Sequence, residues 1–302
     1  MSSRTERTGW RAELPAWRER PAAATQLAKA VLIALIVTVM LYPFLYVVAS
    51  SFATPAAADS GGLLPTSFSL DAYRSIFAGD VVTRALLVSV GITLAGTALS
   101  VLFTVTTAYG LSRTKDVPGA KAALYLILLT MLFGAGIIPQ YLLIRNLGLV
   151  DSYWSLILPG MVSAFNLVVV RNFFMEIPAE LLESARIDGA GELRILLRIV
   201  LPLSRAVIAV IALFYAVGYW NNFFNAMLYL NDSTKWPMPQ VLNEYVLQGG
   251  QLSTVTDLHQ AAPPSQTVQM AVVVIATVPI LAVYPFAQRY FTKGVLTGAI
   301  KG

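Results

Sequence analysis

Ala85–Ser112 reads ALLVSVGITLAGTALSVLFTVTTAYGLS and contains no charged side chain. A helix needs roughly 20 mostly apolar residues to cross the hydrocarbon core of a bilayer, because each residue rises about 1.5 Å. A helix also forms hydrogen bonds between its own backbone N–H and C=O groups, which lipid cannot satisfy. This stretch therefore predicts a membrane-spanning helix.

Five further uncharged stretches are long enough, or nearly so, to do the same. They are Val31–Phe52, Ala122–Ile144, Ser152–Val170, Ala206–Asn231 and Ala261–Gln288, the last expected to begin near Thr267. The chain is 57% hydrophobic and only 12% charged, against about 25% charged in an average soluble domain. The sequence thus predicts an all-α membrane protein with six transmembrane helices.

Glycines and prolines divide several of these stretches. We expect the third span to be weakened near its outer end by Gly134, Gly136 and Pro139, and the fourth by Pro159-Gly160. Pro279 and Pro285 are expected to interrupt the sixth. Such breaks are tolerated where neighbouring helices or water pair the freed backbone groups, which fits a bundle around a path.

The first span has an alternative interpretation as a cleavable signal peptide, because Arg18, Arg20 and Lys29 precede it. Its uncharged core is longer than the roughly 7–15 apolar residues of such a peptide. We interpret it as a membrane anchor.

The positive charge of the chain, +5 in total, is unevenly distributed between its loops. If the N-terminus is cytoplasmic, all other lysines and arginines lie in inner segments, and the outer segments hold only Arg74, Arg84, Arg145 and Lys235. Cationic loops resist translocation, so this bias predicts that both termini are cytoplasmic. We expect an inner tail at 1–27, a transmembrane domain at 28–292 and an inner tail at 293–302. The bias also explains the net charge without a nucleic-acid partner.

Several kinds of chemistry have no residues to support them. The chain has no cysteine, and its one histidine, His259, is a poor metal ligand by itself. A secondary transporter would place ionisable residues at membrane depth, and an intramembrane enzyme would place a polar catalytic set there. The six apolar stretches hold neither. We therefore expect no catalytic residues, no metal and no cofactor.

Small and hydroxyl side chains form one stripe along the second span. Its members are Ser89, Thr93, Gly96, Thr97, Ser100, Thr104 and Thr107. Such a stripe lets neighbouring helices approach closely and form hydrogen bonds. We favour helix packing over the alternative that it lines a polar pathway.

The loop between the fourth and fifth spans, residues 177–202, predicts two short helices joined by a turn. Pro178 and Glu180 suit the start of the first helix, and Asp188-Gly189 is a turn signal, with glycine available for a positive φ. The second helix is expected to place Leu193, Leu196, Leu197 and Val200 on one face and Arg194 and Arg198 on another. This pattern alone leaves open whether the segment lies on lipid or docks a soluble partner.

The residues of this loop resemble the EAA motif of bacterial ABC importer permeases. The landmarks are Glu183-Ser184-Ala185, Gly189 and Ile199-x-Leu201-Pro202, and Ser184 replaces the usual alanine. From about residue 28 to the end, the chain is further similar to the maltose-type carbohydrate permeases, particularly the subunits for oligosaccharides. This similarity rests on three parts of the chain: Pro139–Leu143 with Leu147–Leu149, Tyr153-Trp154 and Leu158-Pro159; Trp220–Ala226; and the tail from Arg289 to Gly302.

The resemblance implies a type I importer. Its implied partners are a second homologous permease, two cytoplasmic ATPase subunits and an extracytoplasmic binding protein. The implied location is a bacterial cell membrane. The implied ATPase-coupling residues are Glu183, Ser184, Ala185, Asp188, Gly189, Leu201 and Pro202. The sequence has no G-x-x-x-x-G-K-[ST] phosphate loop, so ATP is expected on the partner subunits.

The fifth span carries a polar cluster of one indole and three amides. Its members are Trp220, Asn221, Asn222 and Asn225. Amides are costly in lipid unless they find partners. Two interpretations stay open: the side chains bond to neighbouring helices, or they line the substrate path.

Overall fold

The computed structural model describes residues 23–299, apart from 55–56, 58–66, 114–116 and 248–264. The chain divides into two units, Met1–Val47 and Val48–Gly302. The first unit contains most of α1 (Ala23–Ser51), a 29-residue helix. This helix is apolar around its whole circumference, as expected for a helix surrounded by lipid. His259 lies outside the described residues.

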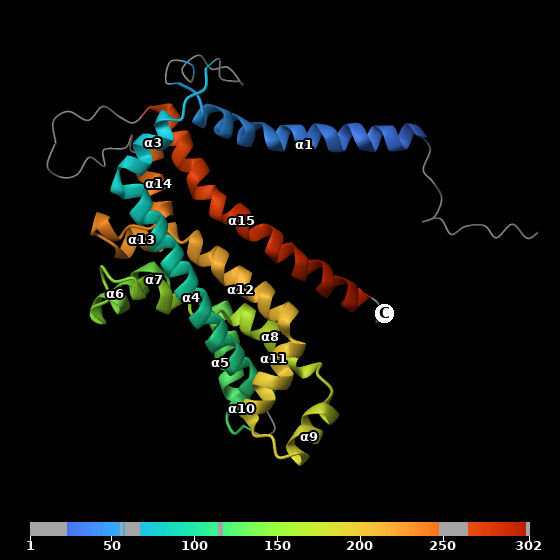
Figure 1. Ribbon diagram of the computed structural model, residues 1–302. Coiled ribbons are helices and arrows are strands. Elements are labelled where there is room, and N and C mark those ends of the chain that lie inside the picture. Colours follow the sequence, from blue (N-terminus) through green and yellow to red (C-terminus); the bar gives the residue numbers. More distant parts are fainter. Residues whose placement is uncertain (1–22, 55–56, 58–66, 114–116, 248–264, 300–302) are drawn as a thin grey trace, which may run out of the picture. The chain divides into compact units, whose positions relative to one another are not determined.

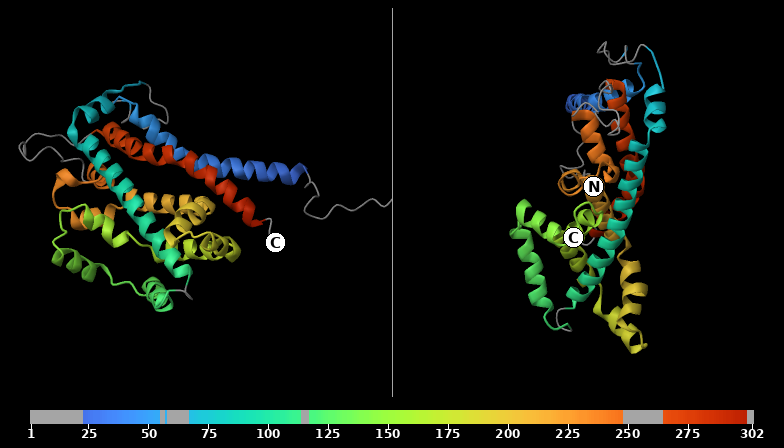
Figure 2. Two further views of the ribbon diagram at one scale, coloured as in Figure 1. Left: turned by 60° about the horizontal axis from the view of Figure 1, so that its bottom comes forward. Right: turned by 90° about the vertical axis from the view of Figure 1, so that its left-hand side faces the viewer.

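The second unit is built around the long helix α4 (Asp80–Ser112), which contains the predicted second span. α4 packs chiefly against α12 (Arg205–Trp220) and α8 (Ala164–Met175), and the three helices can be followed in Figures 1 and 2. The main core lies between them and includes Ala108, Val170 and Ile211.

A second core forms at the other end of α4. There α3 (Asp71–Ala78) and α14 (Met238–Leu247) pack against α4 and against α15 (Gln266–Ala299). Ile76, Met238 and Val272 are buried in this cluster. α4 therefore connects one end of the unit to the other.

The stripe on α4 is used for packing, as predicted, at four of its positions. Gly96 lies against the ring of Tyr219. The Ser100 and Thr104 hydroxyls bond to the hydroxyls of Tyr219 and Tyr215 of α12, at 2.8 and 2.7 Å. Ser89 Oγ accepts a hydrogen bond of 2.7 Å from the backbone N–H at the start of α14. These contacts hold α4 against both neighbours.

Three helices of the described chain are long and apolar enough to cross a membrane, and up to five spans result if each bent helix pair counts as one. The long helices are Ala23–Ser51, Asp80–Ser112 and Gln266–Pro285. The bent pairs are Trp154–Gly160 with Ala164–Met175, at 49°, and Glu192–Leu203 with Arg205–Trp220, at 85°. The structure thus contains three to five of the six predicted spans.

The third predicted span is divided, as its glycines indicate. α5 (Ala120–Leu132) ends before an extended segment, and α6 (Ile137–Asn146) starts after Gly136, whose φ is 82°. The fourth is divided too, because α7 (Trp154–Ile157) is followed by a 3₁₀ turn over Leu158–Gly160 that contains Pro159.

The expected interruption of the sixth span is wrong. α15 runs without a break through Pro279 and Pro285. A proline removes one backbone hydrogen bond, and a helix in lipid tolerates this where neighbouring groups or a local adjustment pair the freed carbonyl.

Candidate functional site

The predicted coupling segment begins with α9 (Ala179–Ile187), which has Pro178 at its N-cap and Glu180 in its first turn. Gly189 follows with a φ of 77°, so the positive φ predicted for this residue is confirmed. The Ala190 N–H donates to the Ala185 carbonyl at 2.9 Å, and the Gly189 N–H donates to the Arg186 carbonyl at 3.0 Å. This pair of bonds is a Schellman motif, which pairs the carbonyls left free at the helix end.

The Schellman motif sets the direction in which the chain leaves α9. Ala185 and Ala190, the two residues joined by the bond of 2.9 Å, both pack against the main core. A single residue with positive φ therefore determines how α9 is presented at this end of the unit (Figure 1).

The second half of the segment comprises α10 (Glu192–Ile195), a π-helical turn (Leu196–Val200) and α11 (Leu201–Leu203). Ile195, Leu196 and Val200 are buried. Leu193 and Leu197, which we expected on the same apolar face, are 68% and 54% exposed. Leu197 lies within the π turn, which has more residues per turn than an α-helix, so a regular 3.6-residue period does not describe this part of the segment.

The predicted coupling residues fall into two groups. Glu183, Ser184, Asp188 and Gly189 are exposed on α9 and its turn. Ala185 instead faces the core, and Leu201 and Pro202 line an apolar groove between α4 and α12. The residues of the first group therefore lie together on the exposed part of one helix and its turn, and those of the second group do not.

The predicted path residues lie at a break in the fifth span. α12 ends at Trp220, and α13 (Phe223–Tyr229) begins after Asn222. Asn222 and Asn225 line a pocket of about 320 Å³ together with Ser163 and Asn166 of the α8 region. No side-chain hydrogen bond joins Asn222 or Asn225 to another described residue. Their amides thus remain available to a ligand.

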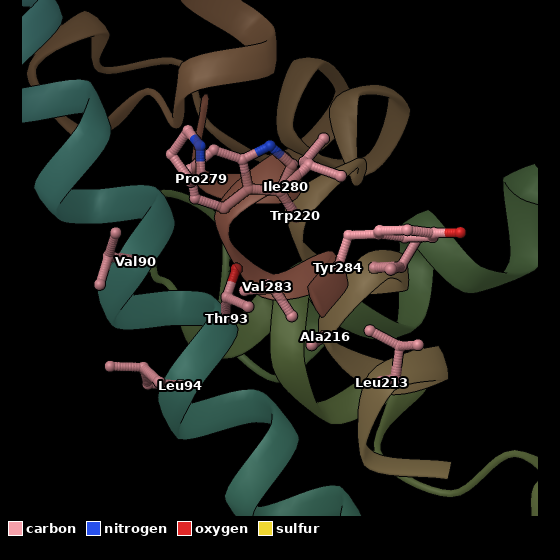
Figure 3. Close-up of a pocket in the computed structure, with 11 residues that line it drawn as sticks. Val90, Thr93, Leu94, Leu213, Ala216, Trp220, Pro279, Ile280, Val283 and Tyr284 are labelled. Atoms are coloured by element: carbon pink, nitrogen blue, oxygen red, sulfur yellow. The ribbon is translucent and has the colours of Figure 1, made fainter. Parts of the chain in front are cut away.

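The other two predicted path residues point elsewhere. Trp220 lines an apolar pocket of about 260 Å³ with Thr93 of α4 and Pro279 of α15 (Figure 3). Asn221 lines a third pocket and donates from Nδ2 to the Val217 carbonyl of its own helix at 3.0 Å. The break between α12 and α13 separates the four side chains.

Two tyrosines that sequence reasoning did not select hold the polar pocket in place. The Tyr215 hydroxyl accepts a hydrogen bond of 2.9 Å from the Ser163 N–H. The Tyr219 hydroxyl donates to the Ile157 carbonyl at 3.1 Å. Both rings line the pocket, and both hydroxyls also bond to α4. In the sequence, the only sign of this role is the i, i+4 spacing of the two tyrosines directly before the polar cluster.

A carboxylate fixes the loop that follows α13. Asp151, with a φ of 58°, accepts hydrogen bonds at Oδ1 from the backbone N–H groups of Asn231 and Asp232, at 2.6 and 2.9 Å. Lys235 Nζ donates to the Asp151 carbonyl at 2.9 Å. The bond from the Asp232 N–H is the main reason that the pKa of Asp151 lies below its usual range. This contact ties the α6–α7 loop to the loop after α13.

No group of three or more histidine, aspartate or glutamate side chains that could hold a metal occurs within the described part of the chain. The candidate sites are therefore the exposed α9 surface and the polar pocket at the α12–α13 break.

Known proteins resemble the chain over most of its length. Residues 30–297 match the family described as "Binding-protein-dependent transport system inner membrane component". The polygalacturonan/rhamnogalacturonan transport system permease protein YtcP of Bacillus subtilis (strain 168) is 50% identical over 264 residues, covering 86% of this chain and 92% of that protein. The galactooligosaccharides transport system permease protein GanQ of the same organism is 30% identical, with 90% and 94% covered.

A solved structure has the same fold. It is the crystal structure of a bacterial ABC transporter involved in the import of the acidic polysaccharide alginate, and one of its chains matches with a TM-score of 0.82 and 31% identity. The match covers 90% of this chain and 98% of that one. The chain belongs to the family of inner membrane components of binding-protein-dependent transport systems.

Proposed function

We propose that this chain is the permease subunit of an ATP-binding-cassette importer that translocates an oligosaccharide. The observation that carries the proposal is the 50% identity, over most of both chains, to a permease named for polygalacturonan and rhamnogalacturonan transport. A permease named for galactooligosaccharides and a chain of an alginate importer support the same cargo class. The complete complex would contain a second homologous permease, two cytoplasmic ATPase subunits that bind the ATP, and an extracytoplasmic binding protein.

Within this complex, α9 and its turn would be the contact with an ATPase subunit. Glu183, Ser184, Asp188 and Gly189 are exposed there, as a docking surface must be. A helix transmits force to a groove only if it enters at a fixed angle, and the Schellman turn supplies that angle.

The direct experiment is purification of the chain with its neighbours. We expect an affinity-tagged chain to copurify in mild detergent with an ATPase and a second permease, and Glu183→Lys to weaken the ATPase band selectively. A chain that purifies alone, yet transports in vesicles without an ATPase, would contradict the proposal.

We further propose six crossings, with residues 28–292 in the membrane domain and both termini in the cytoplasm. The third crossing begins with α5, which has only 13 residues. These span about 20 Å, and the non-helical residues 133–136 add at most about 13 Å. Together they match a hydrocarbon core of about 30 Å.

The topology predicts which introduced cysteines an impermeant thiol reagent can reach. The native chain contains no cysteine, so a single introduced one gives a clean signal. In intact cells, Thr234→Cys, in the proposed outer loop 232–266, should be labelled. Glu176→Cys, at the end of α8, should be labelled only after the membrane is opened. Labelling of Glu176→Cys from outside would reverse the orientation.

We propose the pocket at the α12–α13 break as the part of this chain that the sugar contacts. Asn222 and Asn225, joined by Asn166 and Ser163, present amides and a hydroxyl, which suit the hydroxyl groups of a carbohydrate. Aromatic rings of Phe214, Tyr215 and Tyr219 line the same pocket. Trp220 and Asn221 lie outside it and are weaker candidates.

This division predicts different results for two similar substitutions. Asn225→Ala should raise the substrate concentration for half-maximal uptake by about fivefold, because one lost hydrogen bond to a ligand is worth about 1 kcal/mol. Asn221→Ala is the matched control, since its amide bonds to its own helix. Equal uptake by both variants, in complexes assembled at normal levels, would remove Asn225 from the path.

A further inference from the structure

One carboxylate joins three parts of the unit near the exposed α9 surface. Glu192, the first residue of α10, accepts a hydrogen bond of 2.7 Å at Oε2 from the Tyr109 hydroxyl. The Arg113 guanidinium forms an ion pair with the same oxygen. Arg186 Nε of α9 donates to Glu192 Oε1 at 3.2 Å. The carboxylate thus connects α9 and α10 to each other and both to the end of α4.

The Arg113 side chain makes this cluster more than a surface ion pair. Exposed pairs contribute little, because water and salt screen them. The Arg113 side chain, however, is only 11% exposed, and its guanidinium lies 4.3 Å from the centre of the Tyr109 ring. A guanidinium so enclosed needs its counter-charge, and removing the partner of such a charge is costly. The contact of Glu192 with Arg113 is therefore the strong one in the cluster, whereas the bond from Arg186 joins side chains that are 40% and 56% exposed and is more open to water.

The helix to which Glu192 connects α9 leads on to the polar pocket. From Arg113, at its C-cap, α4 runs back to Thr104 and Ser100, which bond to Tyr215 and Tyr219. These tyrosines line the pocket that contains Asn222. A displacement of α9 that α4 follows would thus reach the α12–α13 break through hydrogen-bonded, closely packed contacts.

We propose that Glu192 is a positioning residue that clamps the Glu183–Gly189 surface to α4, so that movement of an ATPase subunit is transmitted to the membrane helices. This inference rests on the proposed role of α9 as the ATPase contact. The clamp does not bind the ATPase itself. Loss of the clamp should leave the ATPase subunits bound. It should weaken the coupling between ATP hydrolysis and movement of the membrane helices.

The test uses the whole importer, reconstituted in lipid vesicles with its partner permease, ATPase subunits and binding protein. Glu192→Gln removes the charge and nearly preserves the shape, and Tyr109→Phe removes a single hydroxyl. Glu176→Gln, an exposed carboxylate at the end of α8, is the matched control. Spin labels on cysteines at Thr106 and Ala179, both exposed, report the distance from α4 to α9.

We expect Glu192→Gln to broaden this distance distribution and to lower stimulation of ATP hydrolysis by the loaded binding protein about tenfold, the effect of losing a charged hydrogen bond. Tyr109→Phe should have the same two effects to a smaller extent. The double variant should lose no more stimulation than Glu192→Gln alone, because both substitutions act on one contact. Glu176→Gln should match the wild type.

An unchanged α4–α9 distance distribution in Glu192→Gln would overturn the proposed clamp. A broadened distribution would overturn it too if the loaded binding protein still stimulated ATP hydrolysis as in the wild type. Failure of the proposed function looks different. If Glu183→Lys leaves the ATPase bound and fully stimulated, α9 is not the ATPase contact, whatever the distances in Glu192→Gln show.

Discussion

Gly189→Val is expected to abolish most of the ATP-driven uptake while leaving the chain inserted and paired with its partner permease. The residue has a φ of 77°, and a β-branched side chain is strained there by about 1–3 kcal/mol. The chain can relieve this strain by giving up the Schellman bonds from the N–H groups of Gly189 and Ala190. α9 would then meet the ATPase at a different angle. The measurement is binding-protein-stimulated ATP hydrolysis and uptake in reconstituted vesicles.

Gly191→Val is the matched control for this variant. Gly191 lies two residues further on, with a φ of −73°, which valine adopts without strain. An added Cβ meets no atom within 4 Å at either glycine, so the two variants differ in backbone conformation and not in crowding. Gly191→Val should retain most of the activity. Equal loss in both would mean that the positive φ is not what matters, and wild-type activity in Gly189→Val would remove the turn from the coupling mechanism.

Gly96→Ala is expected to destabilise the contact between α4 and α12. A Cβ at Gly96 would lie 2.8 Å from two carbon atoms of the Tyr219 ring. The ring cannot move easily, because its hydroxyl bonds to both Ser100 and the Ile157 carbonyl. Overpacking of this kind costs about 1–3 kcal/mol. Thermal unfolding of the purified protein in detergent should show the loss as a lower midpoint.

Gly91→Ala, on the same helix, is not expected to lower the unfolding midpoint. Its added Cβ meets nothing within 4 Å. Alanine is a better helix former than glycine by about 1 kcal/mol, so the midpoint should stay constant or rise. If Gly96→Ala raised the midpoint as well, the close approach of α4 and α12 at Tyr219 would be wrong.

The sequence predicted well those features that depend on local composition. Hydropathy located the second span, since Ala85–Ser112 lies within α4 and ends at the same residue. Residue chemistry predicted the positive φ of Gly189 and the glycine break before α6. These features follow from the backbone freedom of glycine and from the length of apolar runs, both of which can be read from short windows.

The features that depended on register or on distant contacts were not predictable in this way. The coupling segment contains a π-helical turn, and Leu193 and Leu197, predicted on its apolar face, are exposed. The end of α12 at Trp220 divided one polar cluster among three pockets. The contact between Glu192 and Tyr109 joins residues that are 83 positions apart. Tertiary packing, which places Ala108 of α4 and Ile195 of α10 in one core cluster, brings these two side chains together.

Uptake of a labelled oligosaccharide that the binding protein binds, measured in reconstituted vesicles, tests whether this chain is the permease of an ATP-driven oligosaccharide importer. The vesicles would contain this chain with its partner permease and ATPase subunits, with binding protein outside and ATP either enclosed or omitted. We expect accumulation only when both the enclosed ATP and the binding protein are present, and its loss in Gly189→Val. Accumulation driven by a proton or sodium gradient without ATP would show that the chain is not part of an ATP-driven importer.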